Sequence, residues 1–311
     1  MKEERMKVLE LLQDGKISAD EAASLLQQFP EKEHVLPTSN DGGLFSWLKD
    51  SIFSPGGTKI TLDMSSQPIG GNGISSLRLV GKNGSVSVSG CQGNCIKIKC
   101  QYIPKGDANP QIELYEENGF YELRYDNSAV KYMKISCDVP MIMIDNVYTQ
   151  SSNGNLKFED THCTNIEGHT TNGKVSLENV KAHSAKLYTI NGKISLDNVE
   201  IVHILAETTN GAIKVDKSNQ IGPWAEDHVI EGGTTNGSIS VVLPQNIGIK
   251  LDASTTNGRI SCDIEDDTIH GEISRNHING CNQKYENTEK RIDLKLSTTN
   301  GSIKVEEAHH G

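Results

Sequence analysis

The sequence predicts an all-β fold, a single-stranded parallel β-helix (solenoid), preceded by a small N-terminal α-helical hairpin. Three observations favour the solenoid. The first is a fixed period: Asn-Gly pairs recur along the 311-residue chain, and Gly154, Gly173, Gly192 and Gly211 are 19 residues apart. A period of this length is typical of solenoids, in which each repeat forms one coil.

The second observation is an apolar-polar-apolar pattern after each of these glycines. It is typical of strands with one buried face. We therefore predict that Ile194 and Leu196 lie in one core with their equivalents in neighbouring repeats. The apolar positions two and four residues after glycine are Leu156, Phe158, Val175, Leu177, Ile194, Leu196, Ile213, Val215, Ile239, Val241, Ile260, Cys262, Ile303 and Val305.

The third observation is that identical residue types recur at identical offsets, so that like would stack on like in parallel coils. We expect an asparagine ladder beside a threonine ladder, and Asn-Gly corners held by positive φ. An antiparallel sandwich or meander is the alternative, because Asn-Gly is also a strong hairpin signal. The threonines concerned are Thr171, Thr209, Thr235, Thr256 and Thr299.

The domain predicted to form the β-helix spans residues 58–308. In residues 58–140 apolar and polar residues alternate, but the 19-residue repeat is absent, and we interpret this region as irregular early coils. Val139-Pro140 and Leu243-Pro244 look like equivalent strand starts, where a proline loses no central hydrogen bond. About eleven coils, following one another along the chain, would make a rod about 50 Å long.

The sequence of residues 1–30 predicts a helical hairpin. Gly15 would end the first helix, and Ser18 to Glu21 form a capping box that would start the second. Two helices of this length bury little surface alone. We expect them to bind a protein partner or to self-associate, and docking on the same chain is the alternative. Their candidate partner-binding residues are Leu9, Leu12, Leu25 and Leu26.

Residues 31–57 predict a linker that contains a short amphipathic helix. Leu44, Trp47 and Leu48 are further candidates for partner binding. We favour a helix that covers the open end of the solenoid, since a solenoid end exposes apolar core. The alternative is a helix lying in a membrane interface.

Composition limits the partners and the compartment. The net charge of −11 disfavours nucleic acid and purely electrostatic binding to anionic lipid. Seven cysteines without a dense framework favour a reducing compartment. No ordinary signal peptide and no transmembrane segment is expected, so we predict a cytoplasmic protein. The alternative is a peripheral or cell-surface position reached by a non-standard route.

The motifs resemble a known family. Thr-Thr-Asn-Gly-x-Ile-x-Val, iterated after Val-Pro or Leu-Pro, is similar to the bacterial putative-adhesin family, a domain of unknown function, over about residues 58–308. Leu11-Leu12, Gly15 to Ser18 and Glu21 to Ala23 resemble the N-terminal module of YvlB-like proteins and of the Lia-system daptomycin-response proteins. The resemblance implies a non-enzymatic β-helix protein linked to cell-envelope stress.

Two groups of residues are candidates for chemistry. Cys91, Cys95 and Cys100 are spaced by four and five residues, whereas zinc ligands usually come as two closer pairs. We favour scattered structural thiols and expect no metal or cofactor. The charged group in an insertion between repeats suggests a polysaccharide-cleaving enzyme as one alternative, but a solvated loop is favoured. That group comprises Asp263, Glu265, Asp266, Asp267, His270, Glu272 and Arg275.

His162, His183 and His203 lie at different offsets in their repeats, and we expect exposed corner residues. The leading functional hypothesis is a non-enzymatic scaffold or sensor of the envelope-stress response, which binds a protein or an envelope component. A surface adhesin or envelope-polymer-binding protein is the second hypothesis, and a polysaccharide-active enzyme the third.

Overall fold

The computed structural model describes residues 59–69, 75–141, 144–219, 227–264 and 268–308. All of them belong to the second of two compact units, Gly56–Gly311. The described part of the chain is all-β, with parallel-rich sheets and one short 3₁₀ helix, η1 (Gln283–Glu286). None of its helices is long and apolar enough to cross a membrane. The predicted helical hairpin at 1–30 and the linker at 31–57 lie outside the described residues.

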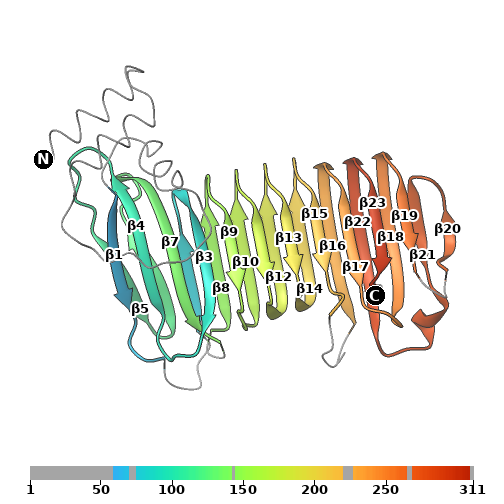
Figure 1. The fold of residues 1–311 in the computed structure, drawn as a ribbon, viewed down its shortest axis with the longest axis horizontal. Coiled ribbons are helices and arrows are strands. Elements are labelled where there is room, and N and C mark those ends of the chain that lie inside the picture. The colour runs from blue at the N-terminus through green and yellow to red at the C-terminus, as the bar shows by residue number, and fades with distance from the viewer. Residues whose placement is uncertain (1–58, 70–74, 142–143, 220–226, 265–267, 309–311) are drawn as a thin grey trace, which may run out of the picture. The chain divides into compact units, whose positions relative to one another are not determined.

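Two sheets form the solenoid (Figure 1). The first sheet has 11 strands, in the spatial order β1 (Ile60–Ser65), β4 (Lys97–Pro104), β7 (Val130–Pro140), β3 (Asn83–Cys91), β9 (Leu156–Glu159), β11 (Val175–Glu178), β13 (Ile194–Asp197), β15 (Ile213–Asp216), β17 (Ile239–Leu243), β23 (Ile303–Glu307) and β19 (Ile260–Asp263). The second has 12, in the order β20 (His270–Ile273), β21 (His277–Cys281), β18 (Gly248–Asn257), β22 (Arg291–Asn300), β16 (His228–Asn236), β14 (Glu200–Thr208), β12 (Lys181–Thr189), β10 (Asn165–Thr170), β8 (Asn146–Ser151), β2 (Ser76–Val80), β6 (Phe120–Tyr125) and β5 (Ile112–Glu117).

Each coil consists of one strand from the second sheet and the following strand of the first sheet. Neighbouring coils pair in parallel with like residues opposite each other, as Ile194 lies opposite Ile213 and Val175. Ile194 and Leu196 are fully buried, and they share one core with the corresponding residues of the adjacent coils. The predicted core and register are therefore confirmed. Stacking of this kind buries one face of every strand in these parallel coils, and this burial stabilises the fold.

The coils from β8–β9 to β16–β17 follow one another along the chain, but the coils near the two ends do not, so the predicted order was wrong there. The described residues form nine stacked coils, in the order β6–β7, β2–β3, β8–β9, β10–β11, β12–β13, β14–β15, β16–β17, β22–β23 and β18–β19. One coil is inserted out of sequence near each end. Pro140 ends β7 and Pro244 follows β17, so the two prolines lie where the chain steps over an inserted coil and do not start strands.

The early coils predicted over 58–140 are also corrected. β1 and β4 pair antiparallel, β4 pairs antiparallel with β7, and β5 forms an antiparallel hairpin with β6. At the other end, β20 and β21 form an antiparallel hairpin on β18. Antiparallel strands thus flank the parallel coils at both ends of the second sheet, and at the β1 end of the first sheet.

Candidate functional site

The Asn-Gly corners are built for close approach between coils, which corrects the predicted role of positive φ. In the asparagine ladder only Asn83 has positive φ, and the glycines that follow the ladder asparagines, such as Gly192, do not. A Cβ added to Gly192 would lie 1.9 Å from the carbonyl oxygen of Gly173, and the same 1.9 Å contact would recur between Gly211 and Gly192. Only glycine allows the backbones to stack this tightly.

Hydroxyl groups complete these corners from inside. The buried Thr189 donates a hydrogen bond to the Gly173 carbonyl at 3.0 Å, and Thr208 bonds Gly192 in the same way. The first threonine of each Thr-Thr pair therefore satisfies a buried acceptor, while the second, such as Thr209, is exposed. The exposed threonines form the predicted ladder, but Ile190 interrupts it with 48% of its surface exposed.

The predicted asparagine ladder is confirmed as a continuous chain of side-chain amides. In each link the Nδ2 of one asparagine donates a hydrogen bond to the Oδ1 of the preceding asparagine of the ladder, at 2.6 to 2.8 Å, as Asn172 does to Asn153. Hydrogen bonds aligned in this way polarise one another. The ladder runs in the order Asn83, Asn153, Asn172, Asn191, Asn210, Asn236, Asn300 and Asn257.

A row of stacked side chains lies beside these corners on the outward face of the second sheet. The Arg78 guanidinium lies 4.4 Å from the ring centroid of Tyr148. The Tyr148 ring lies 5.7 Å from the His169 ring, which stacks on Tyr188 at 4.7 Å with 12° between the planes. Glu167 Oε1 lies 2.7 Å from His169 Nε2 and orients that ring. Stacked rings at the coil spacing present their edges to solvent, and one end of the row is cationic.

Partial burial raises the pKa of Tyr188, and the nearby carboxylates of Glu207 and Glu167 raise it further. The phenol therefore stays protonated at neutral pH and can donate a hydrogen bond to a ligand. This places a donor at the end of the aromatic row, next to the exposed carboxylate of Glu207.

An open groove of about 540 Å³ lies between this row and the exposed threonine ladder. One wall is formed by outward-facing residues of five successive coils, and the other by the corner residues that follow them. The lining residues are Gln150, Ser151, His169, Thr170, Thr171, Tyr188, Thr189, Ile190, Glu207, Thr208, Thr209, Gly233, Thr234 and Thr235.

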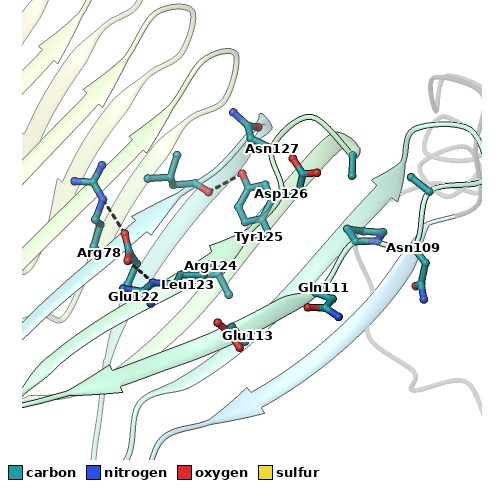
Figure 2. A pocket seen from close by; sticks show the side chains of 14 residues that line it. Arg78, Asn109, Gln111, Glu113, Glu122, Leu123, Arg124, Tyr125, Asp126 and Asn127 are labelled. Atoms are coloured by element: carbon teal, nitrogen blue, oxygen red, sulfur yellow. Dashed lines mark hydrogen bonds and ion pairs between the residues drawn. The ribbon is translucent and has the colours of Figure 1, made fainter.

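A larger hollow, of about 870 Å³, lies beside the other end of the aromatic row (Figure 2). Arg78 lines it and pairs with Glu122 at 3.2 Å, and Arg124 pairs with the same carboxylate at 2.8 Å. Tyr125 donates a hydrogen bond to the Val80 carbonyl at 2.9 Å, and burial raises its pKa to about 12. Arg78 belongs both to this hollow and to the row, so one polar surface runs from the hollow to the groove.

A buried polar pair lies inside the solenoid. Lys217 is fully buried, donates a hydrogen bond to the Ile201 carbonyl and lies 2.9 Å from Nδ1 of His228. Burial lowers the pKa of Lys217 to about 7. Burial, together with the nearby Lys217 and His203, lowers the pKa of His228 to about 3. The Nδ1 atom of the neutral imidazole can therefore accept a hydrogen bond from the Lys217 amine.

The two groups that the sequence offered as candidates for chemistry were expected to be structural thiols and a solvated loop. Cys100 is buried, whereas Cys91 and Cys95 are partly exposed. Within the described ranges, no three His, Cys, Asp or Glu side chains are grouped so as to hold a metal ion. The described members of the charged insertion, Asp263, His270, Glu272 and Arg275, are exposed.

Two expectations about single residues have different outcomes. His162, His183 and His203 were expected to be exposed corner residues. His162 and His183 are exposed, whereas His203 is partly buried. His183 and His203 lie within strands β12 and β14, and their ring centroids are 5.1 Å apart, because the strand register brings Ser184 opposite His203. The predicted partner-binding residues lie outside the described residues, so they stay a prediction. These are Leu9, Leu12, Leu25, Leu26, Leu44, Trp47 and Leu48.

Sequence reasoning missed the aromatic row and the pair of Lys217 and His228. A signal for the row was present: His169 and Tyr188 each precede the repeat glycine by four residues. No comparable repeat signal exists for Lys217, because its partner comes from beyond an irregular insertion.

The profile of the Toastrack DUF4097 family matches residues 57–306, and the chain belongs to this family. The profile of a SHOCT-like domain matches residues 3–33. No curated protein matches the chain.

Several solved structures match the chain at low sequence identity. A putative cell adhesion protein from Clostridium sporogenes is 15% identical, with 81% of this chain and all of that chain covered and a TM-score of 0.39. A putative adhesin from Bacteroides fragilis is 13% identical, with 82% and 99% covered and a TM-score of 0.40. A putative lipid binding protein from Parabacteroides distasonis is 11% identical, with 82% and 98% covered and a TM-score of 0.38.

Proposed function

We propose that this protein is a non-enzymatic binding module of the bacterial cell envelope, which holds an extended envelope component against the outward face of its second sheet. The observation that carries the proposal is the groove beside the aromatic row, which crosses five coils. Long concave surfaces made of repeats suit extended partners. The repeated Asn, Gly and Thr residues already have structural roles in the corners, so repetition of these types does not require catalysis.

In this proposal the module is a scaffold or sensor of the envelope-stress response. Residues 1–30 mediate self-association or bind a protein partner, and the solenoid engages the envelope from the cytoplasmic side. Adhesion is the second candidate, and it requires the same groove outside the cell. Fractionation of the source cells with and without antibiotic stress separates the two.

The experiment is co-sedimentation of the full chain with isolated cell envelopes. Gly233 offers a way to block the groove, because an added Cβ would meet its nearest atoms only at 3.8 Å. We expect Gly233→Trp to reduce envelope binding at least tenfold. The matched control is Ser195→Trp, which places the same ring on the outward face of the first sheet. Equal binding by both variants and the parent protein would contradict the proposal.

A further inference from the structure

We infer that the groove binds an uncharged glycan strand laid along the solenoid axis, with a sugar ring packed at the free end of the aromatic row. The inference rests on the proposed function and names its ligand class. It follows from four features: the direction of the groove, its charge, the paired main-chain groups of the sheet beneath it, and the space beside Tyr188.

The groove runs along the axis, across the strands. Its outward wall consists of Gln150, His169, Tyr188, Glu207 and Gly233, which lie opposite one another in consecutive coils. Four coil steps span about 19 Å. One coil step is comparable with one pyranose unit in an extended β-linked chain, so a polymer of sugar rings meets equivalent positions repeatedly.

The charge of the groove selects against polyanions. Its lining contains one carboxylate, Glu207, and neither lysine nor arginine. The whole chain carries a net charge of −11. An anionic polymer would therefore enter a groove with negative potential and find no cation there. The hydroxyl, amide and phenol groups of the lining instead match an uncharged ligand that is rich in hydroxyl groups.

The sheet backbone beneath the groove offers no edge to a peptide. The central strand, β12, pairs with β10 on one side and with β14 on the other, so its main-chain groups are already used. Extended peptides commonly gain their affinity by adding a strand to a free sheet edge. A ligand of this groove must be recognised by side chains, as glycans are.

Tyr188 ends the aromatic row, and space opens beside it. His169 covers one face of the Tyr188 ring. On the other side the next two wall positions are Glu207 and Gly233, and Gly233 has no side chain to fill the groove. A sugar ring can pack against the remaining face of Tyr188, while the phenol and Glu207 bond its hydroxyl groups.

The test is calorimetric titration of the full chain with β-1,4-linked N-acetylglucosamine oligomers of two to six units. We expect affinity to rise with length up to four or five units and then to level off. A hyaluronan hexasaccharide, which carries carboxylates, should bind at least tenfold more weakly. Gly233→Trp should lower affinity for the neutral hexamer at least tenfold, and Ser195→Trp should leave it unchanged.

Failure of the inference is distinguishable from failure of the proposed function. If isolated envelopes bind the parent but not Gly233→Trp, while the neutral oligomers neither bind nor compete, the glycan inference is overturned and the binding module stands. Stronger binding of hyaluronan than of the neutral hexamer would overturn the charge argument. If envelopes do not bind the parent protein, the proposed function itself is wrong.

Discussion

Replacing Gly211 with alanine should destabilise the solenoid strongly, because the corner has no room for a side chain. The added Cβ would lie 1.9 Å from the Gly192 carbonyl oxygen, far below an ordinary contact. The coils would have to move apart by about 1 Å, which strains the packing at a cost of about 1–3 kcal/mol. The same movement lengthens the hydrogen bond from Thr208 to the Gly192 carbonyl and the side-chain hydrogen bond from Asn210 to Asn191, each worth about 1 kcal/mol. We expect Gly211→Ala to lower the free energy of unfolding by about 3–5 kcal/mol.

The matched control is Gly233→Ala in the next coil. Its added Cβ meets ordinary contacts at 3.8 and 3.9 Å, so stability should stay the same or rise by up to about 1 kcal/mol. Urea unfolding of the parent and both variants, followed by circular dichroism, measures the difference. Equal midpoints for Gly211→Ala and Gly233→Ala would refute the close stacking of the corners.

Three further predictions concern the core, the buried amine and the inserted coil. Leu196→Asp should lower the free energy of unfolding by several kcal/mol, because an unpaired charge enters the core; a melt like that of the parent would show that Leu196 is not buried. In the folded protein Lys217 has a pKa of about 7, so its amine is largely neutral above that pH. In the unfolded chain the same amine stays protonated up to about pH 10. The free energy of unfolding should therefore rise with pH across this window. Between pH 7 and 9 the parent should gain about 2 kcal/mol more than Lys217→Met, measured by urea unfolding at each pH, and parallel pH profiles would contradict this. Truncation after Lys290 removes coil β22–β23 and should expose β18 as well as β16 to proteolysis, whereas protection of β18 would contradict the observed coil order.

The periodic part of the fold was predictable because its signal is local. Each repeat carries its own glycine, its own apolar pair and its own hydroxyl group, and these set the corner and the buried face. Ile194 and Leu196 were therefore assigned correctly from their offsets alone.

The order of the coils was not predictable from the same signal. Because eight of the nine described coils have an Asn-Gly corner and all present a similar apolar face, the repeat alone does not show which coils are neighbours. The links after Pro140 and after Leu243 decide the order, since each carries the chain past the position of one coil. Pro140 and Pro244 lie at these two links, but in sequence a proline at the start of a strand looks the same as a proline in a link that passes over a coil.

The candidate site was predictable only in part. The threonine ladder follows from the repeat, whereas the row from Arg78 to Tyr188 depends on the neighbours that the register supplies. Arg78 meets Tyr148 because coil β2–β3 lies against coil β8–β9, although the two residues are 70 positions apart in the chain. Without the coil order, sequence alone could not join them.

Hydroxyl-radical footprinting of the full chain, with and without isolated cell envelopes, tests most directly the claim that the groove is the binding surface. His169 and Tyr188 line the groove, while Tyr115 and Tyr285 lie elsewhere and serve as internal controls. We predict that envelope binding lowers oxidation of His169 and Tyr188 several-fold and leaves both control tyrosines unchanged. Unchanged oxidation of His169 and Tyr188 on an envelope-bound protein would contradict the account.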